Sequence, residues 1–249
     1  MTTKDLLYKK FVLFGDSITQ RTFDQYILGG DPSRLDYSLG AQLTSIYNRK
    51  LQVLNRGFSG YNTEHARHIL PELLRIEHDE SNSKVELMWI FFGSNDAVEK
   101  GLQKVELERY EQNLNFLTQL ALDRGIKVIL ITPGVVDDSV LSQRDPEWKD
   151  GHFRTTTRNK MYAAAVKRVG KHFNVPVLDL LSALETHGNF EQLLVDGLHF
   201  LGKAYQILFR ELLNLIETEY PELHPDKLPM KLPYWRDIDS SDIEGSLNG

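Results

Sequence analysis

Three residues of this chain have side chains that could act together as a nucleophile, its general base and the aspartate that orients the base. Ser17 follows the apolar residues 11–14 and a Gly-Asp pair, and His199 stands three residues after Asp196. A serine hydroxyl is a weak nucleophile at neutral pH and needs a base within hydrogen-bonding distance. His199 is the candidate base, and Asp196 can bond the other ring nitrogen and stabilise the imidazolium. The pattern predicts nucleophilic acyl transfer at Ser17.

Acyl transfer also develops a negative charge on the substrate carbonyl oxygen, which hydrogen-bond donors must stabilise. Gly57 and Asn95 each follow an apolar segment, at the kind of turn where backbone and amide donors are exposed. We expect the Ser17 N–H, the Gly57 N–H and the Asn95 side chain to form this oxyanion hole. Asp16 is expected to order the nucleophile turn rather than to react.

Other interpretations of these turns stay open at the level of sequence. Each residue alone could be a turn or capping residue, and their joint occurrence after successive strands favours a site. Asp16, Asn95, Asp96, Asp196 and His199 could also form the metal cluster of a phosphoesterase, but such sites usually use several histidines. We therefore expect no metal and no cofactor. A binding protein without catalysis is a third possibility, since fold does not determine function.

Apolar segments and helical patterns alternate five times along the chain, which predicts a parallel sheet with helices on both faces. The expected strands are 11–14, Leu51–Asn55, Val85–Phe92, Ile126–Thr132 and Val175–Asp179. The expected helices are Leu35–Lys50, 62–78, about 106–124, Thr155–Phe173 and about Gly202–Glu219. In open parallel sheets ligands bind at the carboxyl ends of the strands, where Ser17 stands.

Loops and the end of the chain complete the predicted organisation. Residues 21–36 are expected to form a loop over the strand ends, and residues 133–154 a lid or binding loop, with disorder as the alternative for the second segment. Residues 1–220 are expected to form one domain. Prolines recur every four residues from Pro221 to Pro233, which indicates an extended arm over 221–239 that packs, through Trp235, on its own domain or on a neighbouring subunit. The acidic residues 240–249 are expected to be disordered.

Composition limits the classes of partner and compartment. The chain has 249 residues, no cysteine and a formal net charge of −6. Without a basic block we expect no nucleic-acid partner, and no apolar run approaches the ~18 residues of a membrane span. The absence of cysteine and of an apolar leader predicts a cytoplasmic protein.

The motifs FGDSIT, NRGFSGYNT, FFGSNDA, VDGLHF and YWRDID together resemble those of the SGNH (GDSL) hydrolase superfamily, and within it the isoamyl acetate-hydrolysing esterase group. The four letters match Ser17, Gly57, Asn95 and His199. The resemblance implies a flavodoxin-like three-layer α/β/α fold with a mostly five-stranded parallel sheet. It also implies metal-free hydrolysis of short-chain acetate esters through an acyl-serine, and a homodimer. A deacetylase or lysophospholipase-like esterase acting on a larger substrate is the alternative.

Three positions depart from the pattern of that group. Glu64 and His65 replace a common Arg-Trp pair, which we expect to alter the pocket, and Ser94 replaces a common alanine beside Asn95. Leu201 stands where a serine commonly caps the last helix. The cap of that helix must therefore come from elsewhere in the chain.

Overall fold

A five-stranded parallel sheet forms the centre of the protein, in the strand order β2-β1-β3-β4-β5. The computed structural model describes residues 6–26 and 35–247. The strands are β1 (Lys9–Gly15), β2 (Leu51–Gly57), β3 (Val85–Phe91), β4 (Lys127–Ile131) and β5 (Val177–Leu178). The predicted parallel sheet is confirmed, and each predicted strand overlaps an observed one. The strand order, which the pattern left undetermined, is set by the structure.

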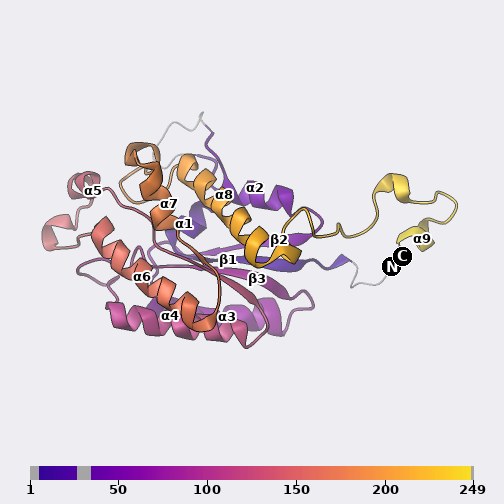
Figure 1. Ribbon diagram of the computed structural model, residues 1–249, viewed down its shortest axis with the longest axis horizontal. Helices are drawn as coiled ribbons and strands as arrows, with labels where there is room; N and C mark the ends of the chain where they lie inside the picture. The colour runs from indigo at the N-terminus through magenta and orange to yellow at the C-terminus, as the bar shows by residue number, and fades with distance from the viewer. Residues whose placement is uncertain (1–5, 27–34, 248–249) are drawn as a thin grey trace.

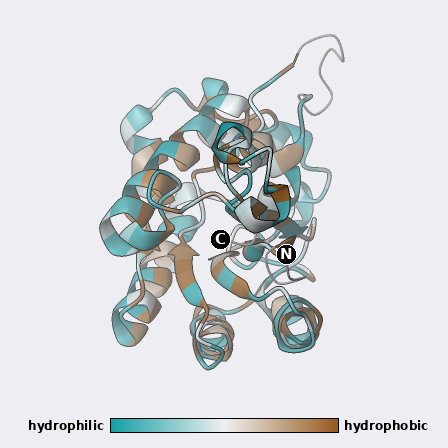
Figure 2. Ribbon diagram, turned by 90° about the vertical axis from the view of Figure 1, so that its right-hand side faces the viewer, coloured by the Kyte–Doolittle hydropathy of each residue, from teal (hydrophilic) through white to brown (hydrophobic). Residues whose placement is uncertain are grey.

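Helices cover both faces of this sheet and make three layers, as Figure 1 shows. Helices α2 (Leu39–Ile46), α7 (Leu180–His187) and α8 (Gly202–Glu219) pack on one face with Phe11, Leu13 and Trp89 of the strands. Helices α3 (Thr63–Leu74), α4 (Leu107–Leu122) and α6 (Thr156–Phe173) pack on the other face with Val12, Phe14 and Met88. The strands at the centre are hydrophobic, whereas the helices around them are mixed (Figure 2).

Strand β1 lies at the point where the direction of winding reverses. Its two neighbours are the next two strands of the chain, β2 on one side and β3 on the other. Gly15 at its carboxyl end is level with Gly57 of β2 and with Phe91 of β3. A crevice opens at such a switch point because the two following connections diverge to opposite faces. The turns that follow β1, β2 and β3 therefore meet at one edge of the sheet.

The observed helices differ from the predicted ones at three places. The segment 133–154, which we expected to be a loop, contains α5 (Asp138–Arg144) and the 3₁₀ turn Trp148–Asp150. Asp137 caps α5 by accepting from the N–H groups of Ser139 and Val140. Helix α7 follows β5 at once and was not predicted, because its short apolar pattern merges with that of the strand. Helix α2 begins at Leu39, four residues later than expected, where Ser38 supplies the cap.

The end of the chain runs away from the domain as an arm (Figure 1). Pro221 opens a 3₁₀ turn, Pro221–Leu223, and Trp235–Asp237 form another. The tail for which we expected disorder contains the short exposed helix α9 (Ile243–Leu247). Parts of the expected loop 21–36 and tail 240–249, namely residues 27–34 and 248–249, lie outside the described residues. Among the described helices, none combines the length and the apolar character needed to cross a bilayer.

Candidate active site

The nucleophile turn joins β1 to the short helix α1 (Ser17–Gln20). Asp16 caps this helix, and its Oδ1 accepts the N–H of Ile18 at 2.9 Å. A Cβ at position 15 would lie 2.5 Å from the Phe91 carbonyl oxygen, so only glycine allows this close approach of β1 and β3. Ser17 is thereby held at the first position of the helix, with 5% of its surface exposed.

The structure brings Ser17, His199 and Asp196 into one hydrogen-bonded series. The Ser17 Oγ lies 3.0 Å from His199 Nε2, although the two residues are 182 positions apart. On the other side of the ring, His199 Nδ1 lies 2.6 Å from Asp196 Oδ2. If Nδ1 carries the proton and donates it to the carboxylate, Nε2 is left free to accept the hydroxyl proton. This is the arrangement that activates a serine for attack.

Asp196 is an anion suited to stabilising an imidazolium. Its Oδ1 accepts two backbone N–H groups, from Leu198 at 3.0 Å and from His199 at 2.8 Å. Burial raises the pKa of this carboxyl, but the bond to the His199 ring, these backbone bonds and the charge of His199 outweigh it and hold the pKa at about 2. The same carboxylate thus shapes the turn and orients the ring.

Asn95 lies in the turn after β3, where it is buried. Its Nδ2 donates to the Tyr61 carbonyl oxygen at 2.8 Å, which links this turn to the one after β2. An amide nitrogen carries two hydrogens, so one remains for a further acceptor. His65 supports the turn after β2, because its ring accepts the Asn62 N–H at 3.2 Å and packs on Tyr61.

The expectation for Gly57 needs correction. Its N–H donates to Asn55 Oδ1 at 2.8 Å within the same strand, so in this structure it is not free to face an oxyanion. Gly60, three residues later, has a positive φ of 79° and an N–H with no acceptor among the described residues. Gly60 also precedes Tyr61, the residue that binds Asn95. The free backbone donor of this turn is therefore at Gly60; Gly57 instead allows close packing on α1, where a Cβ would lie 2.0 Å from the Gln20 nitrogen.

Arg154 connects the turns around the site and was not found by sequence analysis. Its buried guanidinium donates to the Ser94 carbonyl oxygen and to Gln103 Oε1, the latter at 2.5 Å. Gln103 in turn donates to the Gly60 carbonyl oxygen at 2.8 Å. Arg154 therefore ties the turn of Asn95 to the turn of Gly60. No local pattern marks it, because all of these contacts are distant in sequence.

Two carboxyl groups are buried beneath the site. Burial raises the pKa of Asp16 to about 6 and that of Asp96 to about 7. Asp96 Oδ1 accepts the N–H of Thr63 at 2.9 Å, whereas the Oδ2 atoms of Asp16 and Asp96 have no partner among the described residues. Both carboxyls therefore favour the neutral, protonated form more than an ordinary aspartate does.

The missing cap of the last helix comes from Asp36. Leu201 offers no side-chain acceptor at the start of α8, and Asp36 Oδ2 accepts the Gly202 N–H at 2.6 Å instead. A side chain at position 202 would collide with Asp36, since a Cβ there would lie 2.0 Å from Oδ1. The expectation that the cap comes from elsewhere in the chain is confirmed. Asp36 thus anchors the segment that carries His199.

Other polar groups do not join this cluster. His152 bonds Asp145 at 3.2 Å within the segment 133–154. Among residues 6–26 and 35–247, no three His, Asp or Glu side chains gather in a metal-binding group. A small cavity of about 20 Å³ borders His199 and Tyr205, which is room for about one water molecule.

Comparisons with known proteins give a consistent result. Residues 13–207 match the model of the GDSL-like lipase/acylhydrolase family. The chain is 39% identical to the isoamyl acetate-hydrolyzing esterase of Saccharomyces cerevisiae, over 95% of this chain and 98% of that protein. It is 37% identical to the human isoamyl acetate-hydrolyzing esterase 1 homolog, over 98% of this chain and 94% of that one.

Solved structures show the same fold. A lipase/acylhydrolase from Enterococcus faecalis superimposes with a TM-score of 0.64 at 26% identity, covering 90% of this chain and all of that one. An acetylxylan esterase from Geobacillus stearothermophilus gives a TM-score of 0.61 at 20% identity, covering 85% and 95%. The second likeness concerns the fold alone.

Proposed function

Because the chain belongs to the GDSL-like lipase/acylhydrolase family, we propose that it hydrolyses acetate esters of small alcohols, such as isoamyl acetate, at Ser17. The protein is a carboxylic ester hydrolase, as its relatives are. The substrate rests on the names of those relatives. The observation that supports Ser17 as the nucleophile is the pair of hydrogen bonds that joins its Oγ to the His199 ring and the ring to Asp196.

The first half of the reaction forms an acyl-serine. Ser17 Oγ attacks the ester carbonyl carbon while its proton passes to His199 Nε2, 3.0 Å away. The Asp196 carboxylate stabilises the imidazolium that results. When the tetrahedral intermediate collapses, the ester C–O bond breaks and the leaving alcohol takes the proton from Nε2.

The second half releases the acid. A water molecule gives its proton to His199 Nε2 and attacks the acyl carbon, and Ser17 regains its proton as the acid departs. In both halves the negative oxygen rests on the Ser17 N–H, the Asn95 amide and the Gly60 N–H. Gly60 replaces Gly57 in this assignment because its N–H has no acceptor among the described residues, whereas that of Gly57 is bonded to Asn55. Asp16 holds the nucleophile turn through the Ile18 N–H.

The decisive experiment compares wild type and Ser17→Ala on p-nitrophenyl acetate and isoamyl acetate at pH 7–8, each with and without EDTA. We expect hydrolysis that is insensitive to EDTA and lost in Ser17→Ala. Loss of activity in EDTA would instead support the metal-dependent phosphoesterase chemistry considered for the same carboxylates. Hydrolysis of p-nitrophenyl acetate without hydrolysis of isoamyl acetate would instead indicate that the substrate is a larger ester.

We also propose that the protein is a homodimer whose arm covers a second copy. Three large side chains on the arm are exposed, namely Met230 by 49%, Tyr234 by 44% and Trp235 by 66%, and Ile243 in the tail that follows is exposed by 56%. Exposed aromatic residues concentrated on one segment are typical of an interaction surface. Light scattering should give a dimer for wild type and a larger monomer fraction for Trp235→Ala. A monomeric wild type at micromolar concentration would contradict the proposal.

A cytoplasmic location is the last element of the proposal. It is supported by the cysteine-free composition, which suits a reducing compartment. Fractionation of cells that express the untagged chain tests it, and recovery in the medium or with membranes would refute it.

A further inference from the structure

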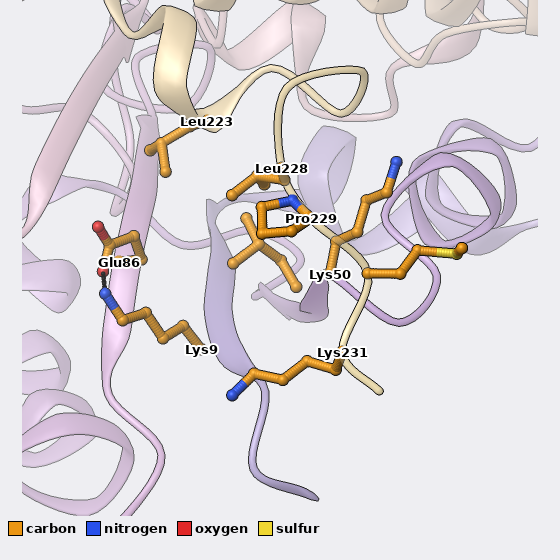
Figure 3. A pocket seen from close by; sticks show the side chains of 9 residues that line it. Lys9, Lys50, Glu86, Leu223, Leu228, Pro229 and Lys231 are labelled. Carbon is orange, nitrogen blue, oxygen red and sulfur yellow. Dashed lines mark hydrogen bonds and ion pairs between the residues drawn. The ribbon is translucent and has the colours of Figure 1, made fainter. Parts of the chain in front are cut away.

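A second cavity lies at the amino-terminal ends of the strands, whereas Ser17 lies at their carboxyl ends. Its volume is about 230 Å³, and it borders the amino-terminal ends of three neighbouring strands, at Lys9 of β1, Leu51 of β2 and Glu86 of β3. The start of the C-terminal arm forms the other wall (Figure 3). Because Ser17 follows the carboxyl end of β1 and this cavity borders its amino end, a ligand here would not touch the catalytic groups.

The walls of the cavity are apolar. Five of its nine lining residues are apolar, namely Leu51, Leu223, Leu228, Pro229 and Met230. Its volume is below the roughly 300–1,000 Å³ typical of pockets for drug-sized ligands. The cavity therefore suits one short apolar chain rather than a two-chain lipid.

Side-chain bonds to the arm hold these walls in place. The Arg49 guanidinium donates to the carbonyl oxygens of Lys231 and Leu232, each at 2.8 Å. Lys50 donates to the Pro225 carbonyl oxygen at 2.5 Å, and the Tyr47 hydroxyl donates to that of Leu223 at 3.0 Å. Because these bonds fix the arm against the domain, binding of a ligand costs little ordering of the protein.

The rim of the cavity carries an excess of positive charge. Among its described lining residues, three are cations, Lys9, Lys50 and Lys231, and one is a carboxylate, Glu86. Glu86 bonds the Lys9 ammonium at 2.6 Å, and Lys50 is directed at the Pro225 carbonyl oxygen. The Lys231 ammonium has no hydrogen-bond or ion-pair partner among the described residues. The group left for a ligand is thus a cation beside an apolar wall.

We propose that this cavity binds a free carboxylate with one medium-length alkyl chain. The chain would lie against Leu51, Leu223 and Leu228, and the carboxylate would pair with Lys231. A charge-assisted bond of this type favours an acid over the alcohol of the same length. None of the described residues that line the cavity is a serine, cysteine or histidine, so the site binds its ligand without reacting with it. This inference does not depend on the substrate proposed for Ser17.

The test measures binding of octanoate, octanol and octylamine to the full chain by isothermal titration calorimetry. We expect octanoate to bind most tightly and octylamine least. Lys231→Glu should weaken octanoate binding about tenfold or more, while octanol changes much less. Lys227→Glu is the matched control, because Lys227 is an exposed lysine of the same arm outside the cavity. Leu228→Trp, which fills the cavity, should abolish binding of both octanoate and octanol.

Ester hydrolysis by each variant serves as the check on folding and on location, and it should stay at the wild-type rate. Three results would overturn the proposal. Wild type could fail to bind octanoate at millimolar concentration, or octylamine could bind as tightly as octanoate. Lys231→Glu could also bind octanoate as wild type does while octanoate inhibits hydrolysis competitively, which would place the ligand at Ser17.

Discussion

Asp36 and Gly202, 166 residues apart, are joined by a hydrogen bond of 2.6 Å from the Gly202 N–H to the Asp36 carboxylate. This bond caps α8 immediately after the turn that presents His199. The helix has no cap of its own, because the residue before Gly202 is a leucine. A segment close to the nucleophile in sequence therefore stabilises the element that carries the base.

Replacing Asp36 should weaken the fold and slow the reaction slightly. Loss of a helix cap costs about 1 kcal/mol, which lowers the melting temperature of a chain of this size by roughly 2–4 °C. Asp36→Asn should retain most of the stability, since the amide oxygen still accepts. Asp226→Ala, which removes an exposed aspartate, is the control. Calorimetry measures the melting temperatures of the two Asp36 variants and of the control. An unchanged melting temperature for Asp36→Ala would contradict the capping role.

Asp196→Asn should lower turnover by up to about 10⁴-fold. The asparagine amide can no longer hold His199 with its Nδ1 protonated and its Nε2 free to accept from Ser17. Oδ1 can still accept the N–H groups of Leu198 and His199, so we expect the turn to fold. Steady-state kinetics on p-nitrophenyl acetate and a melting curve separate the two functions of this residue. Activity within a few-fold of wild type would reassign Asp196 to the turn alone.

Asn95→Ala should reduce turnover by roughly 10²–10³-fold with little change in KM. The oxyanion exists only after attack, so a donor aimed at it stabilises the transition state and not the bound ester. Asn95 also bonds the Tyr61 carbonyl oxygen, so the melting temperature has to be recorded as well. A raised KM at unchanged turnover would exclude the oxyanion role.

Arg154→Ala should lower turnover by roughly 10–10²-fold. Its bonds to Ser94 and Gln103 hold the turns of Asn95 and Gly60 together, and small displacements of catalytic donors are costly. Arg154→Lys should not restore the rate, because one ammonium cannot reproduce the two directions of the guanidinium. Arg168→Ala, which removes an exposed arginine paired with Glu111, is the control. A variant that melts earlier but turns over normally would show that Arg154 supports only the fold.

Asp96 should make the protein less stable as the pH rises. Burial raises its pKa from 3.8 to about 7, so between these values the folded state binds more protons than the unfolded state. The free energy of unfolding therefore falls as the pH increases from about 4 to 7, by on the order of a few kcal/mol. Urea unfolding at pH 5 and pH 8 should show a smaller fall for Asp96→Asn than for wild type. Equal falls would mean that Asp96 ionises as freely in the folded chain as in the unfolded one.

The order of strands and helices followed from local patterns. Segments such as 85–92 and Ile126–Thr132 are apolar on both faces because their strands are covered by helices on both sides, and this predicted the parallel sheet correctly. Helices α5 and α7 were missed. Each is only 7 or 8 residues long, which is too short for a periodic pattern to stand out from the flanking apolar residues.

The sequence by itself predicted Ser17, His199 and Asp196 as the nucleophile, the base and its aspartate, because these are specific residue types at the ends of recognisable elements, and the structure brings the three side chains within hydrogen-bonding distance. Tertiary structure alone decided which donors are free. Asn55 occupies the Gly57 N–H, and this leaves Gly60 as the open donor of the same turn. Tertiary structure also decided that Asp36 caps α8 and that Arg154 connects the turn of Asn95 to the turn of Gly60. Those contacts depend on distances between residues far apart in the chain, and such distances are set by packing, which leaves no periodic trace in the sequence.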